Sequence, residues 1–139
     1  MNLAASQTAA TELQSFLAFD FGQQRTGVAY ASRLLGLAKP QGTVRGSGQA
    51  KWDAIAKHIN EWQPQALVVG VPYHPDGAPH ENTLHAQKFV RQLRSKFGLP
   101  VFEVDERYST TEAQSLGASD VDAASACVIL EQFMRSLDT

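Results

Sequence analysis

Cysteine is scarce in this sequence, which has one Cys in 139 residues. A single Cys excludes an intramolecular disulfide and any structural zinc site built on cysteines. Long apolar runs are absent as well, because runs such as 66–71 fall far short of the roughly 20 residues that cross a bilayer. Positive charge is not in excess either, since 12 Lys and Arg face 14 Asp and Glu, for a net charge of −2. The short apolar runs thus predict no membrane partner. The slightly negative net charge means that a polyanion would have to be held by a local basic patch or through bound metal.

The first residues do not resemble an export signal. Residues 1–14 are small and polar, and they lack the cationic start and the apolar stretch of roughly 7–15 residues that a signal peptide has. Together with the single Cys, this predicts a cytoplasmic protein. The remaining residues have the length of one domain. We therefore predict a mobile leader at residues 1–14 and a single domain at residues 15–139.

The hydrophobic pattern changes along the chain from short runs to helical spacing. The first half has short runs joined by short connections, which is typical of an antiparallel meander. The second half alternates helical periodicity with apolar runs, which is typical of parallel strands. The predicted strands are 16–21, 27–32, 42–45, 66–71 and 101–104, and the predicted helices are 51–62, about 83–97, 109–117 and one that starts near 119–122. The order β-β-β-α-β-α-β-α predicts an α/β fold with a mixed five-stranded sheet flanked by helices.

Carboxylates stand where several of these elements end. Asp20 lies inside the first strand near its end, Asp105 and Glu106 follow the last strand, and Asp122 lies in the first turn of the final helix. Each acid has a local explanation, as a turn cap, an ion-pair partner or a helix N-terminal charge. Their joint position at one edge of a sheet instead favours a shared site. Such a cluster would supply the oxygen ligands that Mg²⁺ or Mn²⁺ prefers, and two ions would support phosphodiester hydrolysis.

Four motifs in order resemble the YqgF/RuvX family. They are FDFGQQRTGVA at 19–29, VGVP at 69–72 with Asp76 and Gly77, DERYSTTEA at 105–113, and VDAASA at 121–126 with Ile129 and Leu130. The resemblance covers residues 16 to 133. It implies a ribonuclease H-like fold and a metal-dependent nuclease that processes the 5′ end of pre-16S rRNA. The segment at 116–121 departs from the family pattern because it is short and has no basic residue.

The resemblance also assigns roles to residues. It implies that the catalytic acids are Asp20, Asp105, Glu106 and Asp122. The metal ligands would be Asp20, Asp122 and one of the Asp105–Glu106 pair, since neighbours on a strand face opposite ways. Asp105 is preferred because it follows the strand directly. The resemblance also implies two bound ions, Mg²⁺ or Mn²⁺.

Two arginines stand beside these acids, and either has the planar fork that clamps a phosphate. Arg25 and Arg107 are therefore candidates for nucleic-acid binding, with a structural ion pair as the alternative role for each. Two other functions stay open, namely resolution of Holliday junctions in branched DNA and non-catalytic RNA binding in ribosome assembly. The oligomeric state, monomer or homodimer, stays open as well.

Overall fold

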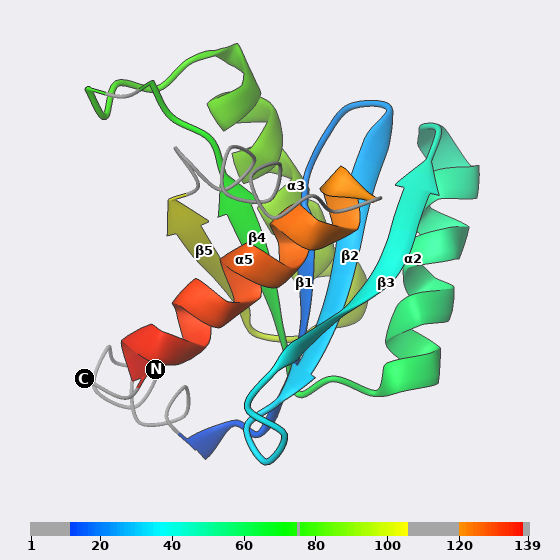
Figure 1. Cartoon of the computed structure of the whole chain (residues 1–139). Coiled ribbons are helices and arrows are strands. Elements are labelled where there is room, and N and C mark those ends of the chain that lie inside the picture. The colour runs from blue at the N-terminus through cyan, green and yellow to red at the C-terminus, as the bar shows by residue number, and fades with distance from the viewer. Residues whose placement is uncertain (1–11, 75, 106–119, 138–139) are drawn as a thin grey trace.

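The computed structural model describes residues 12–74, 76–105 and 120–137, and its elements follow the predicted order (Figure 1). The strands are β1 (Ser15–Asp20), β2 (Arg25–Ser32), β3 (Ala38–Arg45), β4 (Ala66–Val71) and β5 (Val101–Asp105). The helices are α2 (Gly48–Trp62), α3 (Glu81–Phe97) and α5 (Val121–Leu137). The predicted helix at 109–117 lies outside the described residues.

The five strands form one mixed sheet in the order β3-β2-β1-β4-β5. β1 pairs antiparallel with β2, and β2 pairs antiparallel with β3. β4 runs parallel to both of its neighbours, β1 and β5. The carboxyl ends of β1, β4 and β5 therefore lie at one edge of the sheet, and the first turn of α5 lies at this same edge (Figure 1).

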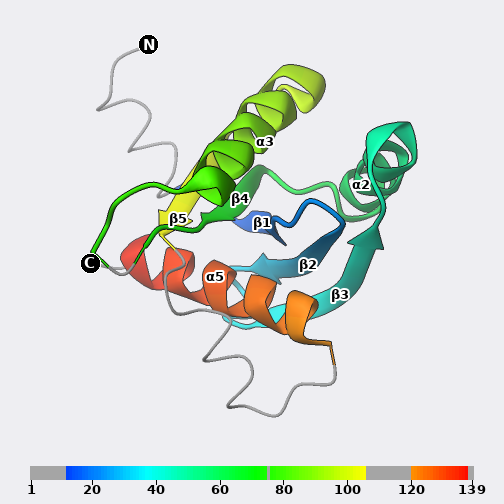
Figure 2. The ribbon, with the colours of Figure 1, turned by 90° about the horizontal axis from the view of Figure 1, so that it is seen from above.

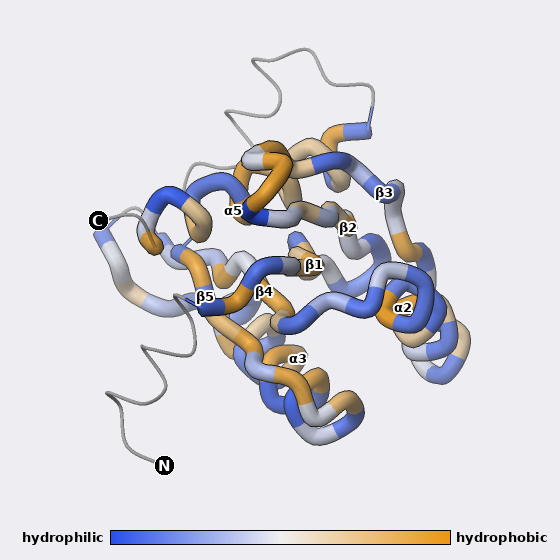
Figure 3. Tube along the Cα trace, turned by 90° about the horizontal axis from the view of Figure 1, so that it is seen from below, coloured by the Kyte–Doolittle hydropathy of each residue, from blue (hydrophilic) through white to orange (hydrophobic). Residues whose placement is uncertain are grey.

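Helices cover the two faces of the sheet in separate layers. Figure 2 shows α2 and α3 on one face and α5 on the other. Leu17 and Phe19 of β1 belong to the core cluster on the α2 and α3 side, whereas Phe16 and Ala18 belong to the cluster under α5. Side chains of one strand thus alternate between two cores, as expected for a sheet covered on both faces. Figure 3 shows hydrophobic residues along α5, and Ala126, Ile129 and Leu130 of this helix belong to the cluster between α5 and the sheet.

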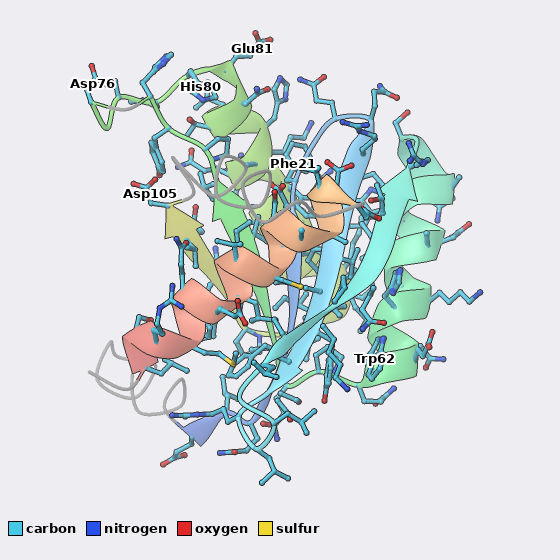
Figure 4. The ribbon with its side chains drawn as sticks, viewed as in Figure 1. Phe21, Trp62, Asp76, His80, Glu81 and Asp105 are labelled. Carbon is cyan, nitrogen blue, oxygen red and sulfur yellow. The ribbon has the colours of Figure 1, made fainter. Side chains whose placement is uncertain are left out.

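Aromatic contacts hold these layers together. Phe16 meets Phe133 of α5 edge to face at 5.2 Å between ring centroids, and Phe19 meets Phe89 of α3 at 5.8 Å. On α2, Trp62 stacks on Tyr30 at 4.4 Å between centroids. Figure 4 shows Trp62 near the carboxyl end of α2, away from the edge where β4 and β5 end.

Some element boundaries differ from the prediction. β2 begins at Arg25, inside the predicted turn, because Arg25 and Thr26 pair with β3. β3 begins at Ala38 and not at Gly42, and its first half has no apolar signal because β3 is an edge strand with exposed Lys39 and Pro40. Edge strands tolerate Lys and Pro because one side of their backbone needs no partner strand.

The described end of the predicted leader contacts the domain. Leu13 packs against the cluster under α5, and the Gln14 carbonyl accepts a hydrogen bond from the Arg33 amide at 2.8 Å. The boundary between residues 14 and 15 stays a prediction. Over the described ranges, no helix combines the length and the apolar character that a membrane span requires.

Candidate active site

Two of the predicted acids meet at the carboxyl edge of the sheet. Asp20 and Asp122 line one cavity of about 460 Å³ together with Arg25. The rest of its lining comes from the β1–β2 connection, the residue after β4 and the first turn of α3, namely Phe21, Gly22, Gln23, Gln24, Pro72 and Asn82. The cavity thus joins carboxylates that are far apart in the sequence, as the sheet-edge argument predicts.

The alternation of β1 places Asp20. Phe16 and Ala18 pack under α5, so Asp20, two residues beyond Ala18, lies on the same face of the strand. Its neighbour Phe21 packs on the opposite side, against Phe89 at 4.9 Å between centroids. Packing of Phe21 into the α3 layer fixes the direction in which the chain leaves β1 and supports the half-buried position of Asp20.

Asp122 is placed by three restraints on the start of α5. Asp120 caps the helix, because its Oδ1 accepts the Ala123 amide at 3.0 Å. The same carboxylate accepts the Thr43 hydroxyl of β3 at 2.9 Å. Gly27 of β2 supplies the third restraint, because a Cβ at this position would lie 2.9 Å from Ala123 N and closer still to the Asp122 carbonyl. The helix can approach β2 this closely only because residue 27 has no side chain.

Asp120 and Thr43 are site-supporting residues that the sequence motifs do not reveal. Asp120 lies two positions before the predicted ligand, and Thr43 lies on an edge strand with no motif of its own. The capping role of Asp120 has a sequence signal, since Asp is a favoured N-cap residue directly before an apolar helix. The link to Thr43 has none, because it depends on strand register.

Arg25 is the one cation among the described residues that line this cavity. Its Nε lies 3.4 Å from Asp122 Oδ2, while its side chain remains 59% exposed. The predicted structural role of Arg25 as an ion-pair partner is therefore present. A guanidinium carries five N–H donors, and among the described residues this ion pair uses only Nε, so the exposed side chain has further donors that could bind a ligand.

Asp105 does not line this cavity. It stands at the tip of β5 (Figure 4) and lines a separate cavity of about 350 Å³ with Tyr73 and with Gln87 of α3. Val101 packs on the α3 side of the sheet, so Asp105, four positions later on the same strand, lies on that side as well. The structure therefore brings together Asp20 and Asp122 and leaves Asp105 apart. Glu106 and Arg107 lie outside the described residues.

A buried lysine lies behind the cavity. Lys51 of α2 is 8% exposed, and its Nζ lies 4.5 Å from the centroid of Phe21 and 4.9 Å from that of Phe89. Burial lowers the pKa of Lys51 below its ordinary value. The two ring faces stabilise its ammonium group by cation–π attraction. Lys51 thus supports Phe21 from the side opposite Asp20.

The described part of the chain does not contain a complete metal centre. Within residues 12–74, 76–105 and 120–137, no three His, Cys, Asp or Glu side chains are grouped so that they could hold an ion. Asp20 and Asp122 provide two oxygen donors of the type that Mg²⁺ and Mn²⁺ take. A third donor must come from elsewhere in the chain or from substrate and water.

The sheet order, the helix layers and the acids at the carboxyl edge define an α/β protein of ribonuclease H-like fold. The same fold is found in Thermus thermophilus RuvC. One RuvC structure, in complex with a Holliday junction substrate, superposes with a TM-score of 0.57 at 15% identity over 91% of this chain and 97% of RuvC. Another RuvC structure gives 0.54 at 14% identity over 90% and 97% of the two chains.

This chain belongs to the RuvX family, whose model is described as Holliday junction resolvase and matches residues 14–136. A relative from Polaromonas sp. named "Putative pre-16S rRNA nuclease" is 65% identical over 137 residues, covering 99% of each chain. A relative of the same name from Albidiferax ferrireducens is 62% identical over 128 residues, which is 92% of this chain and 82% of the relative. The family resemblance expected from the four motifs is thereby confirmed, and with it the class of enzyme, a nuclease that hydrolyses phosphodiester bonds.

Proposed function

We propose that this protein is a divalent-metal-dependent endonuclease that cleaves structured RNA, and that its substrate is the 5′ end of precursor 16S rRNA. One observation carries the proposal: Asp20 and Asp122 line a common cavity with Arg25. The names of the two relatives give the direction toward precursor rRNA. The chain has a net charge of −2, so a polyanion must be held locally, and this cavity combines acids for metal with a cation for phosphate.

The carboxylates fit a magnesium or manganese site. Asp20 and Asp122 would hold the ions, with a third carboxylate from the Asp105–Glu106 pair. When bound, such ions supply an activated water and stabilise the leaving oxygen of the phosphodiester. Arg25 contacts Asp122 at 3.4 Å, so it would hold this carboxylate in the cavity, and its remaining guanidinium donors would bind a phosphate of the substrate.

The third carboxylate is assigned to Glu106 in this proposal. Asp105 lies on the α3 side of the sheet, whereas Asp20 and Asp122 lie on the α5 side. Successive residues of a strand face opposite sides, so the acid after Asp105 is the better candidate by sequence position. This choice reverses the preference for Asp105 that its place at the strand end suggested.

Two other functions are distinguished by experiment. Resolution of Holliday junctions is favoured by the family description and by the fold shared with RuvC. Non-catalytic RNA binding would use the same surface without metal. Cleavage of a precursor 16S leader and of a four-way DNA junction should be compared side by side with Mg²⁺ and with Mn²⁺. We expect cleavage of the RNA leader and little cleavage of the junction.

Single substitutions test the assignment of the acids. Asp20→Asn and Asp122→Asn should abolish cleavage, because an amide is a poor substitute for an anionic metal ligand. Asp53→Asn is the matched control, since Asp53 is an exposed α2 acid bonded to Gln49. Glu106→Gln should lose far more activity than Asp105→Asn. Full metal-dependent cleavage by Asp20→Asn would refute the proposal, and RNA binding without any cleavage by the wild-type chain would favour the binding factor.

A further inference from the structure

Two arginines from neighbouring strands lie directly opposite each other, and one of them, Arg25, lines the cavity. In the antiparallel pairing of β2 and β3, Arg25 is the partner of Arg45. Directly opposite residues share one face of a sheet, with Cβ atoms roughly 4.5–5.5 Å apart. Two pairings further along, Gly27 lies opposite Thr43, and both contact the start of α5. Arg45 therefore shares the face of Arg25 and of the catalytic cavity.

A β-bulge in β3 creates this arrangement. Tyr30 pairs with Lys39 and Ala29 with Pro40, but the next residue, Val28, pairs with Gly42. One extra residue thus enters β3, and every later position moves by one. Without that shift Val44 would lie opposite Arg25, and Arg45 would lie on the other face of the sheet. Bulges commonly redirect a side chain next to a functional site.

The backbone around Arg45 is held close to the cavity. The amide of Gly46 donates to the carbonyl of Gln24 at 2.9 Å. Gln24 itself lines the cavity that contains Asp20 and Asp122. The end of β3 is therefore attached to the β1–β2 connection directly after Arg45, and Val44, directly before Arg45, pairs with Thr26 of β2. Both contacts keep the backbone of Arg45 near the cavity.

Of these two arginines, one has an ion-pair partner among the described residues and the other has none. Among the residues that the structure describes, Arg25 makes one ion pair, with Asp122, and the exposed Arg45 makes none. Like charges directly opposite each other on a sheet are destabilising. An oxyanion placed between the two guanidinium groups removes the repulsion and receives several charge-assisted hydrogen bonds.

We propose that Arg25 and Arg45 form a two-arginine clamp for one backbone phosphate of the nucleic acid, beside the site of cleavage. The inference rests on the proposed function and adds to it a binding residue, Arg45, on a strand that carries no other candidate. The clamp contacts phosphate and not bases, so it contributes affinity and register without sequence preference. It also supplies the local cationic patch that a chain of net charge −2 needs.

Binding without metal tests the clamp separately from catalysis. The probe is a fluorescein-labelled RNA stem-loop titrated in EDTA at several salt concentrations. Arg45→Ala should weaken binding roughly tenfold and reduce the slope of log K against log salt by about 1. Arg45→Lys keeps the positive charge, so the salt slope should stay the same. The affinity should fall in part, because lysine lacks the planar guanidinium that binds phosphate with two hydrogen bonds. Arg25→Ala should resemble Arg45→Ala, and the double variant should lose less than the sum of both.

Lys39→Ala is the matched control, because Lys39 is an exposed cation on the same strand before the bulge. It should leave the slope near that of the wild type. If Arg45→Ala behaves like Lys39→Ala while the wild-type chain still cleaves RNA, the clamp is wrong and the nuclease assignment stands. If the wild-type chain neither binds nor cleaves the RNA, the proposed function fails and the clamp fails with it. Unchanged melting temperatures show that the variants are folded.

Discussion

Replacement of Gly27 by alanine should displace the start of α5 and with it Asp122. A Cβ at residue 27 would meet three backbone atoms of the helix start, and even the most distant of these, Ala123 N, lies only 2.9 Å away. Backbone atoms cannot rotate away as a flexible side chain can, so the helix must retreat. Overpacking of this kind costs about 1–3 kcal/mol. We expect the upper end, about 3 kcal/mol, because α5 carries Ala126, Ile129 and Leu130 of the core beneath it.

A decrease of about 3 kcal/mol in the free energy of unfolding corresponds to a fall of roughly 10 °C in melting temperature for a domain of this size. Thermal unfolding followed by circular dichroism measures it. Gly36→Ala is the control: Gly36 has φ +71° with nothing within 4 Å of an added Cβ, so only the left-handed backbone costs stability there, about 1 kcal/mol. A Gly27→Ala protein that melts with the wild type, or no earlier than Gly36→Ala, would refute the role of close approach.

Two further predictions concern the cap of α5 and the single cysteine. Asp120→Ala removes the carboxylate that accepts hydrogen bonds from the Ala123 amide and the Thr43 hydroxyl, so it should lower the free energy of unfolding, measured in urea, by about 1–2 kcal/mol. Thr43→Val should lower it less, because the helix cap remains. An Asp120→Ala protein as stable as the wild type would contradict this prediction. Burial, with a smaller contribution from Glu131, raises the pKa of Cys127 from 9.0 to about 11, so iodoacetamide at pH 7.5 should alkylate it much more slowly than a free thiol. The unfolded thiol ionises first, so stability should fall as pH rises from about 9 to 11, and Cys127→Ala should flatten that part of the pH profile.

The sequence predicts the layers of this fold well because the buried strands have strong signals. β4 is apolar throughout and is buried at every position, as a strand covered on both faces should be. The edge strand is predicted poorly for the same reason. In β3, Ala38 and Val44 are the apolar side chains that are buried or half-buried. The hydrophobic pattern therefore predicts only the last part of this strand, residues 42–45.

The sequence predicts those residues of the candidate site that lie at the end of a strand or at the start of a helix, and it does not predict the others. Asp20 and Asp122 were expected to meet because each stands at an element end, and they line one cavity. The prediction for Asp105 depends on its exact position in the strand, because a shift of one residue moves a side chain to the opposite face of the sheet. Arg45 and Thr43 depend on register as well, because the bulge between Pro40 and Gly42 decides which later side chains of β3 face α5. No local motif reports such a shift.

The hairpin of β2 and β3 therefore acts as the scaffold for the second carboxylate as well as for the proposed clamp. Gly27 allows the start of α5 to approach β2, and Thr43 attaches that start to β3 through Asp120. The same one-residue shift that places Arg45 opposite Arg25 places Thr43 opposite Gly27. Without the bulge, Thr43 would face α2 and α3, and the cap would lose its partner on the sheet. A single extra residue in an edge strand thus couples the position of Asp122, the proposed metal ligand, to that of Arg45, the proposed phosphate ligand, because it puts Thr43 and Arg45 on one face of the sheet.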